Sequence, residues 1–137
     1  MNYFAWAGAA LALYTLVPPL VKVATRDAPT DVVAVVSNSV LVIAALTITV
    51  YNGHSVTRHL SGRTGVYMLL AGVGLAGGIL AYYHALSLGP VSVVTPIFGL
   101  FIVTSSVAGA AFLNESITPS KVAAVVFALL AIYLAQK

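Results

Sequence analysis

The chain contains no cysteine, which excludes disulfides, thiolate catalysis and cysteine-bound metals. It also has little charge: charged residues make up 7% of the sequence and hydrophobic residues 61%. Ordinary soluble domains carry about 25% charged residues, so a soluble protein of 137 residues would lack the charge to cover its surface. The net charge of +3 is too small and too scattered for a nucleic-acid-binding face.

The sequence instead has five long apolar stretches joined by short polar connections. A membrane-spanning helix needs about 20 mostly apolar residues to cross about 30 Å of hydrocarbon. We therefore predict an all-α integral membrane protein with one transmembrane helix per stretch, in a single domain over residues 1–137. The first stretch lacks the basic leading region of a signal peptide, so we expect a retained helix. The five predicted spans are residues 3–23, 31–51, 65–86, 91–113 and 118–135.

Prolines interrupt two of these spans. Pro18 and Pro19, near the end of the first span, lack the N–H groups that would bond two carbonyls one turn earlier. Such freed carbonyls indicate either a simple kink near the interface or a helix end that lines a cavity. Pro96 frees the carbonyl of Ser92 in the fourth span in the same way. Candidate breaks or hinges are therefore Pro18, Pro19 and Pro96, together with Gly74 and Gly78, whose GxxxG spacing lets helices approach closely.

Asn38 is a polar side chain within a few residues of the middle of the second span. An amide without a partner in hydrocarbon costs several kcal/mol, so Asn38 is expected to face another helix or water. Contact with a neighbouring helix and contact with a ligand both satisfy this requirement, and the sequence leaves both open.

Lysine and arginine are divided equally between the two membrane faces. Five crossings place Arg58, Arg63 and Lys121 on one face, and Lys22, Arg26 and Lys137 on the other. Because basic residues normally gather on the cytoplasmic side, an equal count gives no preferred orientation. The chain either inserts both ways and pairs antiparallel, or carries too few charges to show a bias.

Enzymatic chemistry has little support in the sequence. His54 and His59 lie at one membrane face and His84 at the other, so they are too far apart to share one metal ion. The three carboxylates are all interfacial: Asp27, Asp31 and Glu115. We therefore predict that the chain is not an enzyme and has no cofactor and no metal.

The second half of the sequence resembles a known family. Residues 82–97, YYHALSLGPVSVVTPI, residues 112–121, FLNESITPSK, and an alanine- and valine-rich last helix are similar to an EamA-like domain of the drug/metabolite transporter superfamily. The matching features are an Ala-Leu pair closing the third helix, a proline early in the fourth, and a Glu-x-Ile-Thr turn before the fifth.

The resemblance implies a five-helix unit that works with a second unit of inverted topology. Helices one to four would enclose a substrate cavity, and the fifth would lie outside. Glu115 would be a structural cap or an interfacial anchor. His84 would act either as a proton-coupling group or as a packed residue. The cavity or gate candidates are Tyr14, Asn38, Tyr82, Tyr83, His84, Ser92 and Thr95.

From these observations we expect a small-metabolite or drug transporter of the cell membrane that works by alternating access. One unit does not surround a substrate, so we expect an antiparallel homodimer, or pairing with a related five-helix chain. Membrane lipids and a small-molecule substrate are the other expected partners, and no nucleic acid is. The alternatives are an accessory or structural membrane protein without transport activity, and a lipid-carrier flippase.

Overall fold

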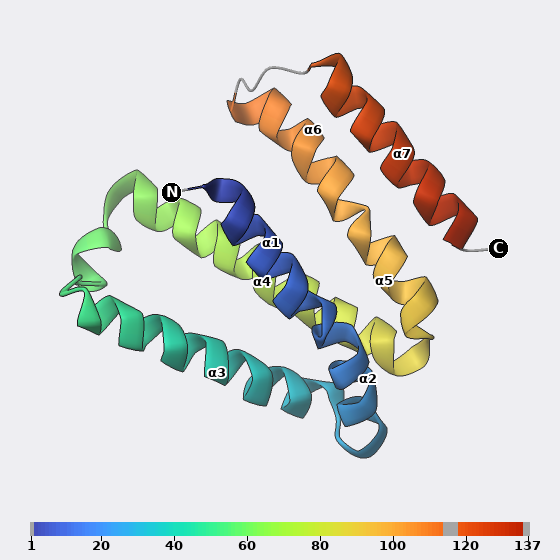
Figure 1. Ribbon diagram of the computed structural model, residues 1–137. Helices are drawn as coiled ribbons and strands as arrows, with labels where there is room; N and C mark the ends of the chain where they lie inside the picture. The colour runs from blue at the N-terminus through green and yellow to red at the C-terminus, as the bar shows by residue number, and fades with distance from the viewer. Residues whose placement is uncertain (1, 114–117, 136–137) are drawn as a thin grey trace. The chain divides into compact units, whose positions relative to one another are not determined.

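The computed structural model describes residues 2–113 and 118–135, and these residues are helical with short connections. The all-α prediction is confirmed. Helices α1 to α4 form one compact unit and α5 to α7 a second. The helices are α1 (Tyr3–Thr15), α2 (Val17–Asp27), α3 (Thr30–Tyr51), the 3₁₀ helix η1 (Thr57–His59), α4 (Gly62–Leu88), α5 (Val91–Gly99), α6 (Phe101–Leu113) and α7 (Pro119–Ala135) (Figure 1).

Four segments of the described chain are long and apolar enough to cross a membrane: Tyr3–Asp27, Thr30–Tyr51, Gly62–Leu88 and Val91–Leu113. The fifth predicted span corresponds to the shorter helix α7, whose apolar part is Val122–Ala131. The first and third spans extend beyond their predicted ends because polar residues in the headgroup layer do not terminate a helix. The predicted turn glutamate, Glu115, lies outside the described residues.

The first span is broken at Leu16, between α1 and α2. Leu16 has φ −82° and ψ −19°, and its N–H donates to the Leu13 carbonyl at 3.3 Å, one residue short of the α-helical spacing. The two prolines follow in the first turn of α2, where a missing N–H costs little. Because the helix continues to Asp27, the break lies near the middle of the span, and not near its end as the sequence suggested.

The fourth span is broken at Leu100, between α5 and α6. The Leu100 N–H bonds the Ile97 carbonyl at 3.2 Å, again in the tighter i−3 pattern. Pro96, the predicted hinge, lies inside α5 one turn earlier. The break follows Gly99, a residue type with low helix propensity.

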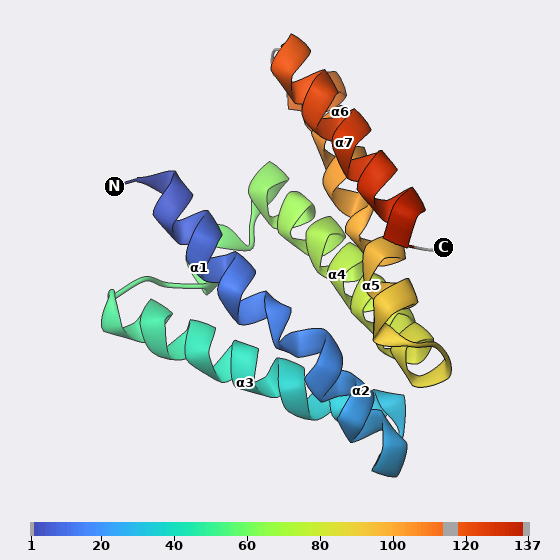
Figure 2. The same ribbon diagram turned by 45° about the vertical axis from the view of Figure 1, so that its right-hand side comes forward.

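The buried side chains of the first unit gather where α2, the start of α3 and the end of α4 meet. Figure 2 shows α2 against the start of α3, and α4 packs against both α2 and α3. Within this unit α1 packs only against α2 and buries none of its residues. The buried apolar residues are Val21, Val33, Ala34, Tyr82, Tyr83 and Leu86. In the second unit α7 runs back beside α5 and α6.

Glycines shape the connection between α3 and α4. Gly53, with φ +67°, ends α3 by donating to the Val50 carbonyl, while His54 N–H donates to the Thr49 carbonyl. This pair of bonds is the Schellman termination, which needs a left-handed residue. Gly65, in the first turns of α4, is buried beneath the Leu60 carbonyl, and a Cβ there would overlap that carbonyl.

Gly65→Ala should therefore destabilise the protein relative to Gly72→Ala. Both changes remove a glycine from α4 and raise helix propensity by about 1 kcal/mol. A Cβ at Gly72 meets nothing within 4 Å, whereas one at Gly65 forces the Leu60 backbone to move, at a cost of about 1–3 kcal/mol. Unfolding in mixed detergent micelles measures the difference. Equal stability of the two variants would show that the loop does not pack on α4.

Candidate functional site

The seven cavity candidates are divided between the two units. Tyr14 is exposed in α1, two residues before the break at Leu16. Asn38 is half-buried in α3, and His84 is exposed near the end of α4. Tyr82 and Tyr83 are buried in α4, with ring centroids 6.4 Å apart. The two remaining candidates, Ser92 and Thr95, lie in α5 of the second unit.

Tyr83 and Ser37 form a polar tie between α4 and α3. The Ser37 hydroxyl donates to the Val33 carbonyl at 2.7 Å and lies 3.2 Å from the Tyr83 hydroxyl. A serine hydroxyl has one proton, and the shorter bond to Val33 takes it. Tyr83 is then the donor to Ser37, which leaves the phenol oxygen with lone pairs to accept a further hydrogen bond.

Asn38 lies in a shallow, open pocket along one face of α3. The pocket residues are spaced i, i+3, i+4, i+7 and i+8, which is the spacing of one helical stripe. The Asn38 amide nitrogen donates to the Ala34 carbonyl of its own helix at 2.8 Å. Its amide oxygen accepts no hydrogen bond from any residue that the structure describes and is available to a donor. The pocket is lined by Val35, Asn38, Ser39, Val42 and Ile43.

Lys22 reaches from α2 to the end of α4, where its Nζ donates to the Ser87 carbonyl at 3.2 Å. The last carbonyls of a helix carry partial negative charge, so the ammonium group stabilises the end of α4 and holds α2 against it. Sequence reasoning missed this contact, since nothing in the local sequence pairs residues 65 positions apart.

The structure brings only some of the predicted residues together. Tyr82, Tyr83 and the start of α3 share the buried region of the first unit. His84 is exposed, and Ser87 Oγ donates to its backbone carbonyl at 2.7 Å. Among the described residues, no group of three or more histidines and carboxylates is arranged to hold a metal ion. The site therefore offers hydrogen-bonding groups in an apolar setting: amide, phenol and hydroxyl.

Gly74 and Gly78 do not make the close helix contact expected from their spacing within the first unit. A Cβ built at either position meets nothing within 4 Å. Their surface on α4 is available to another helix.

Four apolar segments long enough to cross a membrane define an integral membrane protein, and two of these segments are interrupted near their middle. The sequence model of the EamA-like transporter family matches residues 2–136, and the chain belongs to this family. It is therefore a membrane transporter of the drug/metabolite transporter superfamily, a group of transporters and not of enzymes. No curated protein and no solved structure matches the chain.

A double-mutant cycle tests the tie between α3 and α4. Tyr83→Phe and Ser37→Ala each remove the interhelical bond, so their effects on the free energy of unfolding should couple by about 0.6 kcal/mol. A matched cycle of Tyr83→Phe with Ser39→Ala should show no coupling, because Ser39 lies on the face of α3 that lines the shallow pocket, whereas the hydroxyl that Tyr83 contacts is that of Ser37. Additivity within error in both cycles would contradict the Ser37–Tyr83 bond.

Proposed function

We propose that this protein moves an amphipathic or aromatic small molecule, a metabolite or a drug, across the cell membrane by alternating access. The observation that carries the proposal is the family match over residues 2–136. The two broken spans support it, because interruptions near mid-membrane are typical of transporter helices that line a binding site and move.

Each break supplies one part of the proposed movement. The α1 helix packs only against α2 within its unit and is joined to it at Leu16, so it can swing without disrupting the α2–α3–α4 core. Leu100, preceded by Pro96 and Gly99, would permit bending between α5 and α6. Gly74 and Gly78 offer a smooth surface on α4 along which a neighbouring helix can slide.

Within the first unit the substrate would contact Tyr14, Tyr82 and Tyr83 through their rings, with Asn38 orienting it by a hydrogen bond. His84 would lie at the gate of the first unit, and Ser92 and Thr95 are the polar candidates of the second unit. An aromatic or amphipathic solute fits this set because phenol rings bind apolar surface and also present a polar tip. The free amide oxygen of Asn38 would accept from a hydroxyl or amine of the solute.

The second five-helix domain of the transporter would come from another copy of this chain, or from a related chain, inserted upside down. The equal division of lysine and arginine between the two faces, three against three, supports insertion in both orientations. An inverted pair of chains would then enclose the cavity that a single chain would leave open on one side.

Purified protein in liposomes should show saturable uptake of at least one solute from a panel of amphipathic and aromatic metabolites and drugs. Asn38→Ala should reduce that uptake about tenfold, the value of one hydrogen bond to a substrate in an apolar site. Thr47→Ala is the control and should leave uptake within about twofold, because its hydroxyl bonds the Ile43 carbonyl of its own helix. Absence of uptake for every solute, with both orientations present, would favour an accessory role.

Orientation is measurable without removing any native thiol, since the sequence has no cysteine. Ser61→Cys introduces one exposed thiol in the loop between α3 and α4. If the chain inserts both ways, a membrane-impermeant maleimide should label about half of the molecules in intact cells, and all of them after permeabilisation. Labelling of all or none before permeabilisation would reject the homodimer of inverted copies and require a separate partner chain.

A further inference from the structure

The connection between α3 and α4 is a folded basic element. Its backbone is fixed by the Gly53 termination of α3, by η1, and by the close contact of Leu60 with Gly65. Its side chains add two bonds: Ser55 Oγ lies 3.1 Å from Thr57 Oγ1, and His59 Nδ1 lies 2.9 Å from the Ser55 carbonyl. The loop therefore presents its exposed residues from a defined surface.

Two arginines, Arg58 in η1 and Arg63 in the first turn of α4, give this surface a charge of +2 at pH 7 with histidine counted as neutral. Both are exposed, and neither forms an ion pair with any residue that the structure describes. The sequence has no carboxylate between Asp31 and Glu115. Glu115 is the only acidic residue that the topology assigns to this face, so it neutralises at most one of the two arginines.

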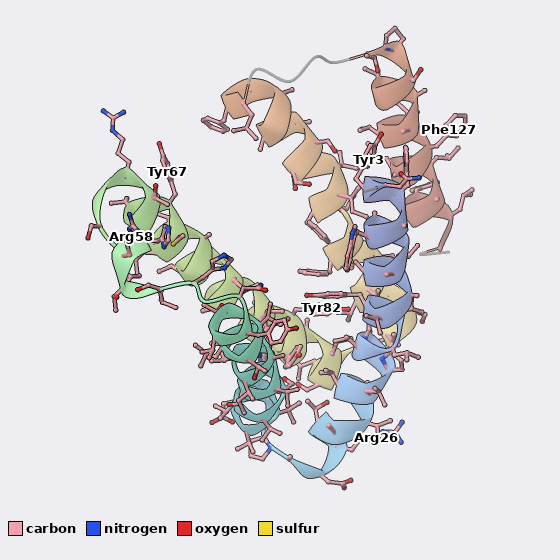
Figure 3. All side chains as sticks on the ribbon, turned by 60° about the vertical axis from the view of Figure 1, so that its left-hand side comes forward. Tyr3, Arg26, Arg58, Tyr67, Tyr82 and Phe127 are labelled. Atoms are coloured by element: carbon pink, nitrogen blue, oxygen red, sulfur yellow. The ribbon has the colours of Figure 1, made fainter. Side chains whose placement is uncertain are left out.

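The surface lies at the level of the lipid headgroups. At 1.5 Å per residue, the 27 residues of α4 span about 40 Å, whereas the hydrocarbon core is about 30 Å thick. The excess of about 10 Å reaches the headgroup layer, and the polar residues Arg63 and Thr64 favour placing the first turn of α4 there. Tyr51 and Tyr67, 90% and 69% exposed, flank the loop, and exposed tyrosines are typical of this layer. Figure 3 shows Arg58 and Tyr67 at one end of the first unit and Arg26 at the other.

We propose that the α3–α4 loop binds the phosphate of anionic phospholipids through Arg58 and Arg63. A guanidinium group matches a phosphate with two parallel hydrogen bonds. Basic residues at a membrane surface each contribute about 1 kcal/mol of attraction to anionic lipid, and here no described carboxylate competes. The proposal does not depend on transport: it concerns the lipid shell around the protein.

The experiment measures lipid preference by electron paramagnetic resonance in phosphatidylcholine vesicles at pH 8. Spin-labelled phosphatidylglycerol and spin-labelled phosphatidylcholine are compared by the fraction that the protein immobilises. The wild type should prefer phosphatidylglycerol, and Arg58→Gln with Arg63→Gln should reduce that preference by about fivefold for each arginine. The double lysine variant should keep most of it, because the charge remains.

Arg26→Gln is the matched control. Arg26 is also exposed at a membrane interface, but it lies at the α2 end of the unit next to Asp27. Its loss should leave the preference unchanged. The proposal is overturned if the wild type has no preference, if the double glutamine variant keeps it, or if Arg26→Gln lowers it equally. It is also overturned if inorganic phosphate, but not chloride at equal ionic strength, displaces the lipid, because the loop then binds free phosphate.

Discussion

Hydrocarbon offers no hydrogen-bond partner, and this constraint determines most of the structure. Every backbone polar group inside the bilayer must be satisfied by the protein itself, which explains why the described spans are helical. The polar side chains in the spans obey the same rule: the hydroxyls of Thr15, Thr47 and Ser106 each bond a carbonyl one turn earlier in their own helix. The interruptions at Leu16 and Leu100 obey it as well, because their N–H groups bond the carbonyls of Leu13 and Ile97 in the tighter i−3 pattern.

Contacts between helices gain little from burial in lipid, because lipid tails are as apolar as leucine. The first unit accordingly combines a small apolar core with polar ties. Ser37–Tyr83 joins α3 to α4, and Lys22–Ser87 joins α2 to α4. Together they hold three helices at one end of the unit, whereas α1 has no such tie to α3 or α4 among the described contacts. The first unit therefore consists of three helices joined by side-chain hydrogen bonds and a fourth, α1, that contacts only α2.

The sequence predicts the helical segments well, because length and hydropathy alone determine which residues lie in lipid. Proline identifies the two interrupted spans, but not the residue where each helix breaks. Whether the break at Leu16 lies near the middle of its span depends on how far α2 continues beyond the prolines. The break at Leu100 lies one turn after Pro96 and not at the proline itself. The contacts of Lys22 and Tyr83 were not predictable, since each depends on a residue in another helix, and the contact of Gly65 with Leu60 depends on how the loop before α4 folds. The cavity assignments remain predictions.

Counting charges treats all basic residues alike, but the structure gives them different environments. Lys22 bonds the end of α4, so part of its charge is balanced within the protein. Arg58 and Arg63 have no described counterion and are held by η1 and by the first turn of α4. In an inverted pair, one copy of this loop would face each leaflet, so both leaflets would need anionic lipid to match it. Lipid composition on the two sides would then influence how the two orientations pair, a role that an equal count of lysine and arginine conceals.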